Sequence, residues 1–375
     1  MAHAYTPGLK VLHYTKLKKN RRLPIKGEVS KGKGDKVNAD DVIAKTDLPG
    51  NVNMLKVANL LNISPADIHD VLEVKEGDTV NKGDMIAQTD GLFGFFKSDV
   101  RSPISGTIES ISDVTGQIVM REAPIPVEVD AYVEGIVSDV IKDEGVTIES
   151  EAAYIQGIFG IGGESRGDLH VVVNNRDEEI TKDSINSSHA GKIIVGGSFI
   201  SLDAYKKAIE LKVRGVVVGG FNYFDLEDIL GYTLGVAITG TEDLVTSLIV
   251  TEGYGNIKMS ERTFNLLKKH DGKFVSVNGA TQIRAGVIRP EIVIPLDADQ
   301  IPDNKKDDRE NLGIQKGSLV RVIRAPYFGK IGEVTDLPSE LQKMESETMV
   351  RVATVKINSE SFTIPRSNLE MLETD

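Results

Sequence analysis

Four glycine-rich segments carry polar side chains of the kinds that bind anions. They span residues 157–167 (GIFGIGGESRG), 239–243 (TGTED), 251–255 (TEGYG) and 278–286 (NGATQIRAG). Glycine loops at strand ends can present backbone N–H groups to an anion, and an arginine can add a bidentate fork. The sequence therefore predicts a candidate ligand-binding set made of Gly162, Gly163, Glu164, Arg166, Glu252, Asn278, Gln282 and Arg284.

These loops match no nucleotide-binding motif. None contains the GxxxxGK[ST] pattern of a P-loop, and the 157–167 segment precedes a strand instead of opening a helix. The interpretation we favour is a set of tight turns between short strands. A small-molecule or anion site at their junction is the alternative, and catalysis by Glu164 and Glu252 as an acid and base pair is a third.

Other catalytic and metal-binding chemistry finds no support in the sequence. The chain has no cysteine, which excludes disulfides, thiol catalysis, iron–sulfur clusters and cysteine-ligated zinc. Its six histidines are scattered and form no HExxH motif, and GESRG is not the GxSxG of a hydrolase. We therefore assign no catalytic residue and expect no metal site.

The composition is that of a folded, acidic chain with several domains. Its 375 residues exceed one ordinary core, and its 36 glycines favour tight turns and short strands. The net charge of −12 argues against wrapping nucleic acid with the whole surface, although it allows a local basic patch. No secretory signal or long apolar window is present, so we expect a cytoplasmic protein without a membrane partner.

The chain contains internal repeats within its first 150 residues. GDKVNADDVIAKTD (34–47) aligns without gaps on GDTVNKGDMIAQTD (77–90), and nine of the fourteen positions are identical. A weaker echo pairs residues 106–119 with residues 135–148, each a glycine, a short β-run, a polar turn and a second β-run. Both repeats predict short strands that begin after glycine turns.

The repeat and the following SPISGTIESI resemble a barrel-sandwich hybrid, the hammerhead fold of biotinyl and lipoyl domains, over roughly residues 20–150. LPIKG (23–27) is similar to the start of the corresponding domain in the sodium-pumping quinone reductases. The resemblance implies that the GDxVxxGDxIA arm and the SPxxGxI arm pack as a pseudo-symmetric pair. Residues 53–72 have helical spacing, and we expect them to form a small insertion on the barrel surface.

The resemblance raises the question of a carried cofactor. Carrier domains present a modified lysine at a hairpin tip, whereas the corresponding segment TDGLFGFFKSDVRSP has no lysine in its turn. Its one lysine, Lys97, follows the turn, so we expect a structural scaffold with no cofactor. The apolar residues 92–96 then plug the protein's own core, which we favour, or contact a partner.

Residues 151–295 read as a glycine-rich α/β domain. Residues 193–200 and 214–221 are apolar strands, and the amphipathic segment 202–213 between them is typical of a helix. Strand–helix–strand order with apolar strands predicts a parallel layer.

The polar residues 296–313 predict a linker, and residues 314–375 resemble a KOW motif in a small SH3-like barrel. The residues that carry the resemblance are Gly317, Val320, Val322, Gly329, Gly332 and Val334. It implies a loop that contacts RNA, a polymerase or a ribosomal protein, and because the chain is acidic we favour protein over RNA or a ribonucleoprotein. The implied contact residues are Arg321, Arg324, Tyr327, Phe328 and Lys330.

The expected fold is thus a mixed α/β, β-rich chain of three units: a barrel-sandwich hybrid at 1–150, an α/β domain at 151–295 and a KOW barrel at 314–375. The expected function is non-enzymatic binding or scaffolding, by docking on transcription or translation machinery or by forming a homo-oligomer. The alternative is a small-molecule-binding or enzymatic α/β domain with its site at the glycine-rich loops.

Overall fold

The two repeats fold into two β-modules, one nested within the other. In the computed structural model, Val37 pairs with Gly135 and Val80 pairs with Gly106, so the first arm meets the last and the second meets the third. We call residues 11–48 with 125–156 the outer module and residues 52–121 the inner module. The structure describes residues 9–89, 97–232, 239–240, 242, 244–282, 288–302, 314, 316–322, 324, 326–327, 330–343, 349–358 and 360–372.

The outer module packs two sheets against each other. Its core contains Ile43, Ala44, Tyr132, Val137 and Ile148. One sheet is formed by β1 (Val11–Arg22), β13 (Gly145–Gln156), β12 (Gly135–Ile141) and β3 (Lys36–Val37), and the other by β11 (Ile125–Asp130), β4 (Val42–Leu48) and β2 (Glu28–Val29).

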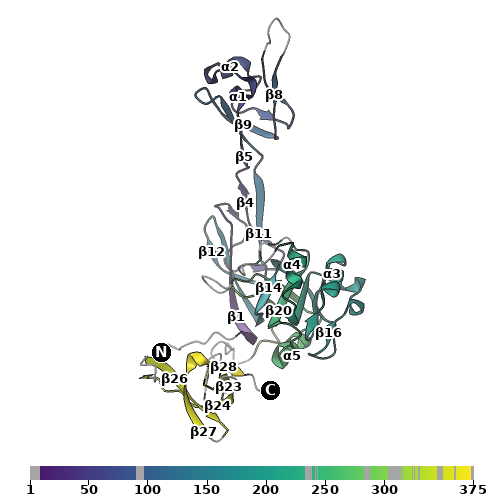
Figure 1. Ribbon diagram of the computed structural model, residues 1–375, viewed down its shortest axis with the longest axis vertical. Helices are drawn as coiled ribbons and strands as arrows, with labels where there is room; N and C mark the ends of the chain where they lie inside the picture. The colour runs from purple at the N-terminus through teal and green to yellow at the C-terminus, as the bar shows by residue number, and fades with distance from the viewer. Residues whose placement is uncertain are drawn as a thin grey trace.

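The inner module repeats this plan at the far end of the molecule (Figure 1). Its strands pair in two sets, β6 with β9 and β7 with β8. The segment 90–96, expected as a core plug, lies outside the described residues, and Lys97 is exposed. The strands are β5 (Val52–Leu55), β6 (Thr79–Val80), β7 (Met85–Gln88), β8 (Asp99–Arg101), β9 (Gly106–Ser112) and β10 (Gln117–Arg121).

The helical segment of the inner module is not a surface insertion. It forms α1 (Val57–Leu61) and α2 (Ile68–Val71). Val57 and Ile68 have no exposed surface, and both belong to the same core as Ile86 and Ile118. The expectation of a surface position was wrong because the module's strands are too short to enclose a core without the helices.

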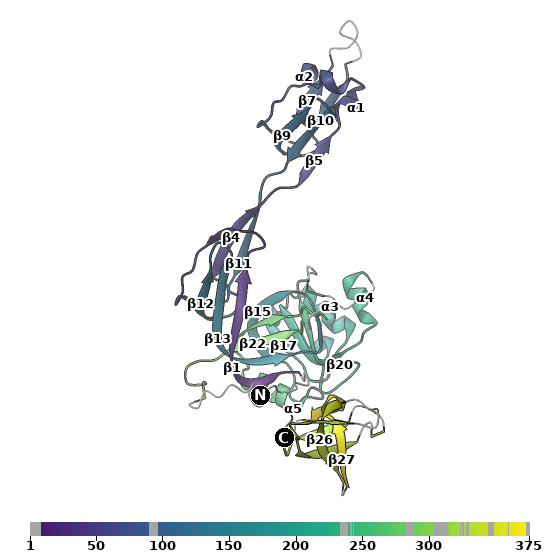
Figure 2. The ribbon, with the colours of Figure 1, turned by 90° about the vertical axis from the view of Figure 1, so that its left-hand side faces the viewer.

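A two-stranded neck joins the modules (Figure 2). β4 pairs with β11 up to Leu48, and β5 pairs with β10 from Val52 onward. Between them, the N–H of Glu122 donates to the carbonyl of Asn51 at 3.0 Å. A Cβ atom at Gly50 would lie 2.0 Å from the carbonyl oxygen of Glu122, so only glycine allows this close approach.

The sheet of the outer module continues into the α/β domain without interruption. β13 pairs with β22 (Glu291–Pro295), β22 with β21 (Phe274–Asn278) and β21 with β15 (Glu164–Val171). The boundary expected at residue 150 falls within β13, so the two units share one sheet. Neighbouring strands of this shared sheet follow the order β14-β20-β19-β17-β15-β21-β22-β13-β12-β3.

The parallel layer predicted for the α/β domain is confirmed. β15, β17 (Ile193–Val195), β19 (Gly215–Phe221) and β20 (Ser247–Tyr254) run parallel. The short strand β18 (Phe199–Ile200) pairs parallel with β19 beyond the end of β17, and β16 (Glu179–Ile180) pairs parallel with β18. β14 (Phe159–Ile161) pairs antiparallel with β20. The helices are α3 (Leu202–Glu210), α4 (Asp225–Leu230) and α5 (Glu261–Lys269).

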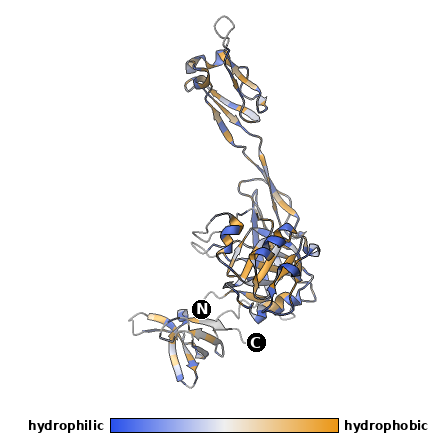
Figure 3. Cartoon of the chain, turned by 45° about the vertical axis from the view of Figure 1, so that its right-hand side comes forward, coloured by the Kyte–Doolittle hydropathy of each residue, from blue (hydrophilic) through white to orange (hydrophobic). Residues whose placement is uncertain are grey.

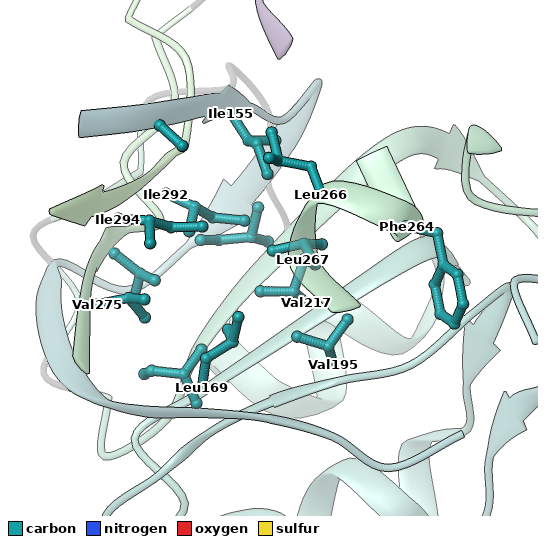
Figure 4. Close-up of a cluster of buried hydrophobic side chains, with 14 of the residues drawn as sticks. Ile155, Leu169, Val195, Val217, Phe264, Leu266, Leu267, Val275, Ile292 and Ile294 are labelled. Atoms are coloured by element: carbon teal, nitrogen blue, oxygen red, sulfur yellow. The ribbon is translucent and has the colours of Figure 1, made fainter. Parts of the chain in front are cut away.

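Apolar strands at the centre of this domain are enclosed by more hydrophilic helices and turns (Figure 3). In Figure 4, Ile155 of β13 and Ile292 of β22 lie in one cluster with Leu266 and Leu267 of α5. The core of the α/β domain therefore includes residues of the outer module. None of the described helices has the length and apolar character needed to cross a lipid bilayer.

A small antiparallel β-unit follows at the C-terminal end, shown in yellow in Figure 1. Its buried residues include Val320, Val322, Val334, Val355 and Ile364. The expected linker is described only as far as residue 302. The strands are β23 (Leu319–Val322), β24 (Ile331–Asp336), β25 (Leu341–Lys343), β26 (Met349–Ile357), β27 (Glu360–Pro365) and β28 (Leu369–Leu372).

Candidate functional site

A chain of charged side chains joins the outer module to the α/β domain at the start of β15. Arg21, near the end of β1, donates two hydrogen bonds to the carboxylate of Glu164, at 2.6 Å from Nη1 and 2.8 Å from Nη2. Parallel bonds of this kind fix the orientation of both partners. The Arg21 side chain is only 15% exposed, so the pair is better shielded from water than an ordinary surface ion pair.

Asp130, at the end of β11, receives two arginines. Arg166 donates through Nη2 to its carboxylate, and Nη2 of Arg21 lies 3.1 Å from the other oxygen. Arg166 also lies 2.6 Å from Asp40. Burial alone would raise the pKa of Asp130, but the hydrogen bond and charge of Arg166, together with Arg21, outweigh burial and lower that pKa. We call this group the arginine clamp: Arg21, Asp40, Asp130, Glu164 and Arg166.

A buried carboxylate lies beside the clamp. Glu291, at the start of β22, is 8% exposed. It accepts hydrogen bonds from the hydroxyls of Tyr132 at 3.2 Å and Tyr154 at 2.9 Å, and it pairs with Lys19. Burial, and then the negative charge of Glu291, raise the pKa of both tyrosines. One cation and two hydroxyl donors thus satisfy the carboxylate, as a buried charge requires.

Tyr132 has a backbone conformation that bulky residues rarely adopt, with φ of +64°. Its N–H donates to the carbonyl of Ala39 at 2.9 Å, and its carbonyl accepts from the Ser276 hydroxyl. Its ring centroid lies 5.3 Å from the guanidinium carbon of Arg21. Neighbours from three separate segments hold Tyr132, which explains how a strained conformation persists at this junction.

Glu164 and Arg166 therefore have partners within the protein, and their assignment to a ligand site stays a prediction. Sequence reasoning missed Arg21, Asp130 and Glu291. A signal existed only for Glu291, a lone carboxylate that opens the apolar strand EIVIP. Arg21 carried no signal because Glu164 is 143 residues away in the chain.

Three of the four glycine-rich segments meet around Gly160 in β14. The Thr239 hydroxyl donates to the carbonyl of Gly160 at 2.8 Å, and the N–H of Gly160 donates to the Thr281 hydroxyl at 2.9 Å. The N–H of Thr239 in turn donates to the carbonyl of Thr281 at 2.8 Å. Both threonine side chains are buried, so these loops form a closed, hydrogen-bonded junction.

The backbone donors of this junction face a carboxylate of the chain itself. The N–H groups of Gly162 and Gly240 donate to Glu242 at 3.1 Å and 2.6 Å. The carbonyl of Gly163 accepts from the Ser247 hydroxyl at 3.1 Å. The converging N–H groups expected at such loops are present, and the Glu242 carboxylate accepts from them.

The fourth segment, with Glu252, lies at the opposite end of the sheet from Glu164. The hydroxyl of Ser247, the first residue of β20, donates to the carbonyl of Gly163 directly before Glu164, whereas Glu252 lies five residues further along β20. At about 3.3 Å per residue this places Glu252 roughly 16 Å along the strand from Ser247, so the structure does not bring the two carboxylates together as an acid and base pair. Glu252 instead accepts from the N–H of Ser260 at 2.8 Å, and burial raises its pKa.

The other members of the predicted ligand set are dispersed. The side-chain oxygen of Asn278 accepts from the N–H of Ala280 at 2.8 Å, within the turn after β21. Gln282 forms an isolated β-bridge with Ile288. Arg284 lies outside the described residues.

Two open hollows lie on the outer module. The first, of about 250 Å³, is lined by residues 36–38 and 134–136. The second, of about 290 Å³, borders the first and is lined by β12, β13 and the end of β22. Neither is lined by a glycine-rich segment. Within the part of the chain that the structure describes, no three acidic or histidine side chains gather as metal ligands.

The loop between β23 and β24 carries the predicted partner-contact residues. Arg324 is exposed, and the ring of Tyr327 lies 4.6 Å from that of the phenylalanine in β27. The Lys330 ammonium lies 5.7 Å from the Tyr327 ring, within reach of a cation–π contact. Arg321 lies within β23, where it pairs with β24, and Phe328 lies outside the described residues.

Comparison with models of protein families gives a match to part of the chain. No curated protein matches the chain. The model of the RnfC barrel sandwich hybrid domain matches residues 68–142, one fifth of the chain. The match covers the inner module from α2 onward, continues through β11 and ends one residue after β12. The chain is therefore similar over this region to the RnfC barrel sandwich hybrid domain, in agreement with the barrel-sandwich expectation for the N-terminal region.

Proposed function

We propose that the protein is a non-enzymatic scaffold that holds the inner module away from a rigid base and docks on a partner protein. The observation that carries the proposal is the arginine clamp. Arg21, Glu164, Arg166 and Asp130 pair their charges with one another, and in doing so they fix the outer module to the α/β domain. Charged groups that bind substrate would instead face an open pocket.

The docking element in this proposal is the C-terminal unit. Its resemblance to a KOW, SH3-like barrel implies a contact loop, and that loop presents Arg324 and the Tyr327–Lys330 pair. A basic loop with an aromatic ring suits an acidic protein surface, and the same chemistry suits RNA. The acidic chain as a whole favours a protein of the transcription or translation machinery.

Sedimentation of native lysate, with and without RNase, tests this function. We expect co-migration with ribosomes or polymerase that RNase leaves unchanged and that the double variant R324A/K330A loses. The matched control is K316A/K356A, which removes the same charge from exposed lysines of the same unit. A light peak at monomer mass contradicts the proposal, and loss of co-migration with RNase alone assigns the loop to RNA.

A second candidate function is the binding of a small anion where the three glycine-rich segments meet. The converging N–H groups of Gly162 and Gly240 favour it. Titration with inorganic phosphate, followed by amide NMR, tests it directly. We expect the amides of these two glycines to shift most if the site binds anions, and unchanged amides with full retention of the Glu242 contact contradict it.

A further inference from the structure

A ladder of aromatic rings runs from the core of the α/β domain to its surface. Phe159 is buried, and its ring centroid lies 5.3 Å from that of Tyr254. Tyr254 lies 5.2 Å from Tyr223, which lies 6.0 Å from Phe224. The exposed fractions are 45% for Tyr254, 40% for Tyr223 and 82% for Phe224. Three neighbouring aromatic side chains thus face solvent over a buried fourth.

The ladder stands at the carboxyl ends of two adjacent parallel strands. Tyr254 is the last residue of β20, and Tyr223 and Phe224 follow the end of β19 directly. Phe221 pairs with Tyr254 across these strands. In open α/β sheets, binding sites form outside the carboxyl ends of the strands. The exposed rings therefore occupy the edge of the sheet where this architecture places ligands.

The stretch of chain that carries the exposed rings is acidic. Residues 215–257 contain six aspartates and glutamates and no lysine, arginine or histidine. Glu227 and Asp228, on α4 directly after Phe224, are exposed. Arg289 lies beside the segment that carries Phe159, and its guanidinium donates to the carbonyl of Ile158 at 3.0 Å. Negative charge beside exposed ring faces attracts cations and repels acidic partners.

We propose that the surface formed by Tyr223, Phe224, Tyr254 and the acidic start of α4 docks an arginine- or lysine-bearing peptide segment of a partner protein. The cationic side chain lies over the ring faces, and the carboxylates of α4 attract it. Ring faces carry the negative end of the aromatic quadrupole, so rings and carboxylates favour the same ligand charge. This surface is separate from the C-terminal unit, and its role does not depend on the proposed function.

Fluorescence anisotropy with the full chain tests the proposal. The probe is a labelled octapeptide of alternating arginine and glycine, and its glutamate counterpart is the charge control. We expect the arginine peptide to bind and the glutamate peptide not to bind. Phe224→Ala weakens the arginine peptide by about two- to five-fold, the size of an exposed cation–π contact. Val114→Ala, which truncates an equally exposed apolar side chain on the inner module, leaves binding unchanged.

Two further substitutions separate a cation–π contact from an apolar one. Phe224→Tyr keeps a ring face and retains affinity for the arginine peptide. Phe224→Leu keeps only apolar surface, and its affinity for the peptide falls as far as that of Phe224→Ala. Equal binding by wild type and Phe224→Ala overturns the proposal, as does the absence of arginine-peptide binding. Full binding by Phe224→Leu overturns the cationic assignment, and a self-association that Phe224→Ala abolishes assigns the surface to a second copy instead.

Discussion

The outer and inner modules share their turns and differ in their surroundings. In each, the glycine N–H of the GD turn donates to the opposite arm at 2.8 Å, from Gly34 to Val137 and from Gly77 to Ile108. The aspartate carboxylate then closes the turn. Asp35 accepts from the N–H of Gly32 at 2.7 Å, and Asp78 accepts from the N–H of Lys75 at 2.8 Å. Matching atoms form matching bonds, so the local sequence sets the turn regardless of what surrounds it.

The surroundings of the two modules determine how each is stabilised. The outer module shares its sheet with the α/β domain and is held there by the arginine clamp. The inner module has its own core, and among the described residues it is joined to the base through the neck near Gly50. The same kind of β-module is thus part of a sheet shared with the α/β domain in one case and a separately packed unit in the other.

The largest expected effect comes from truncating the equivalent isoleucine in each module. Ile43 and Ile86 are equivalent and fully buried, so each change to alanine costs about 2–5 kcal/mol of unfolding free energy. Ile86→Ala lowers a separate transition of the inner module, because that core is independent. Ile43→Ala lowers the main transition of the base. Calorimetry with hydrogen exchange measures both, and a single shared transition in both variants would contradict this division.

The next test removes the clamp. Arg166→Gln leaves the partly buried Asp130 with fewer partners, and we expect a loss of about 2 kcal/mol in the base. The inner module keeps the hydrogen-exchange protection of the wild type, because no clamp residue belongs to it. Arg121→Gln is the control, since it breaks an exposed pair with Glu109 and a hydrogen bond to the carbonyl of Gly50 in the neck, and we expect it to cost less than Arg166→Gln.

A smaller test compares the two turn glycines. Gly34 and Gly77 have φ of +92° and +89°, and a Cβ at either would meet nothing within 4 Å. Alanine therefore costs only the backbone strain, about 1–2 kcal/mol at each site. Chemical denaturation of the two variants measures these costs. Clearly unequal costs would show that the surroundings, and not the turn alone, set the strain.

The smallest test uses pH. The folded-state pKa of Asp130 is lowered, so its contribution is present above the unfolded value near 4 and is lost as pH falls through the folded value. Asp130→Asn removes this dependence. Urea unfolding between pH 2 and pH 6 measures the free energy of unfolding as a function of pH. For the transition of the outer module and α/β domain, we expect the variant to lose less stability at low pH than the wild type, and we expect the transition of the inner module to be unchanged. Identical limbs would mean that the clamp carries no charge-dependent stability.

Several features were determined by the sequence alone. The 34–47 and 77–90 repeat set two identical glycine turns, because a positive φ and an aspartate cap are local properties. Apolar runs set the strands, so the parallel layer around β19 was predicted correctly. The strand expected at 193–200 is interrupted at Gly196 and Gly197 and forms β17 and β18 instead, and the helix expected at 202–213 ends at Glu210.

Only the tertiary structure decided which arms pair and what the polar residues do. The sequence shows two repeats, but nested pairing depends on hydrogen bonds between segments such as β3 and β12, which lie about 100 residues apart. Glu164 and Arg166 stand in a glycine-rich segment that suggests a ligand loop. Their charges are paired because folding brings Arg21 and Asp130 beside them, and long-range electrostatic pairing leaves no periodic signal in a chain.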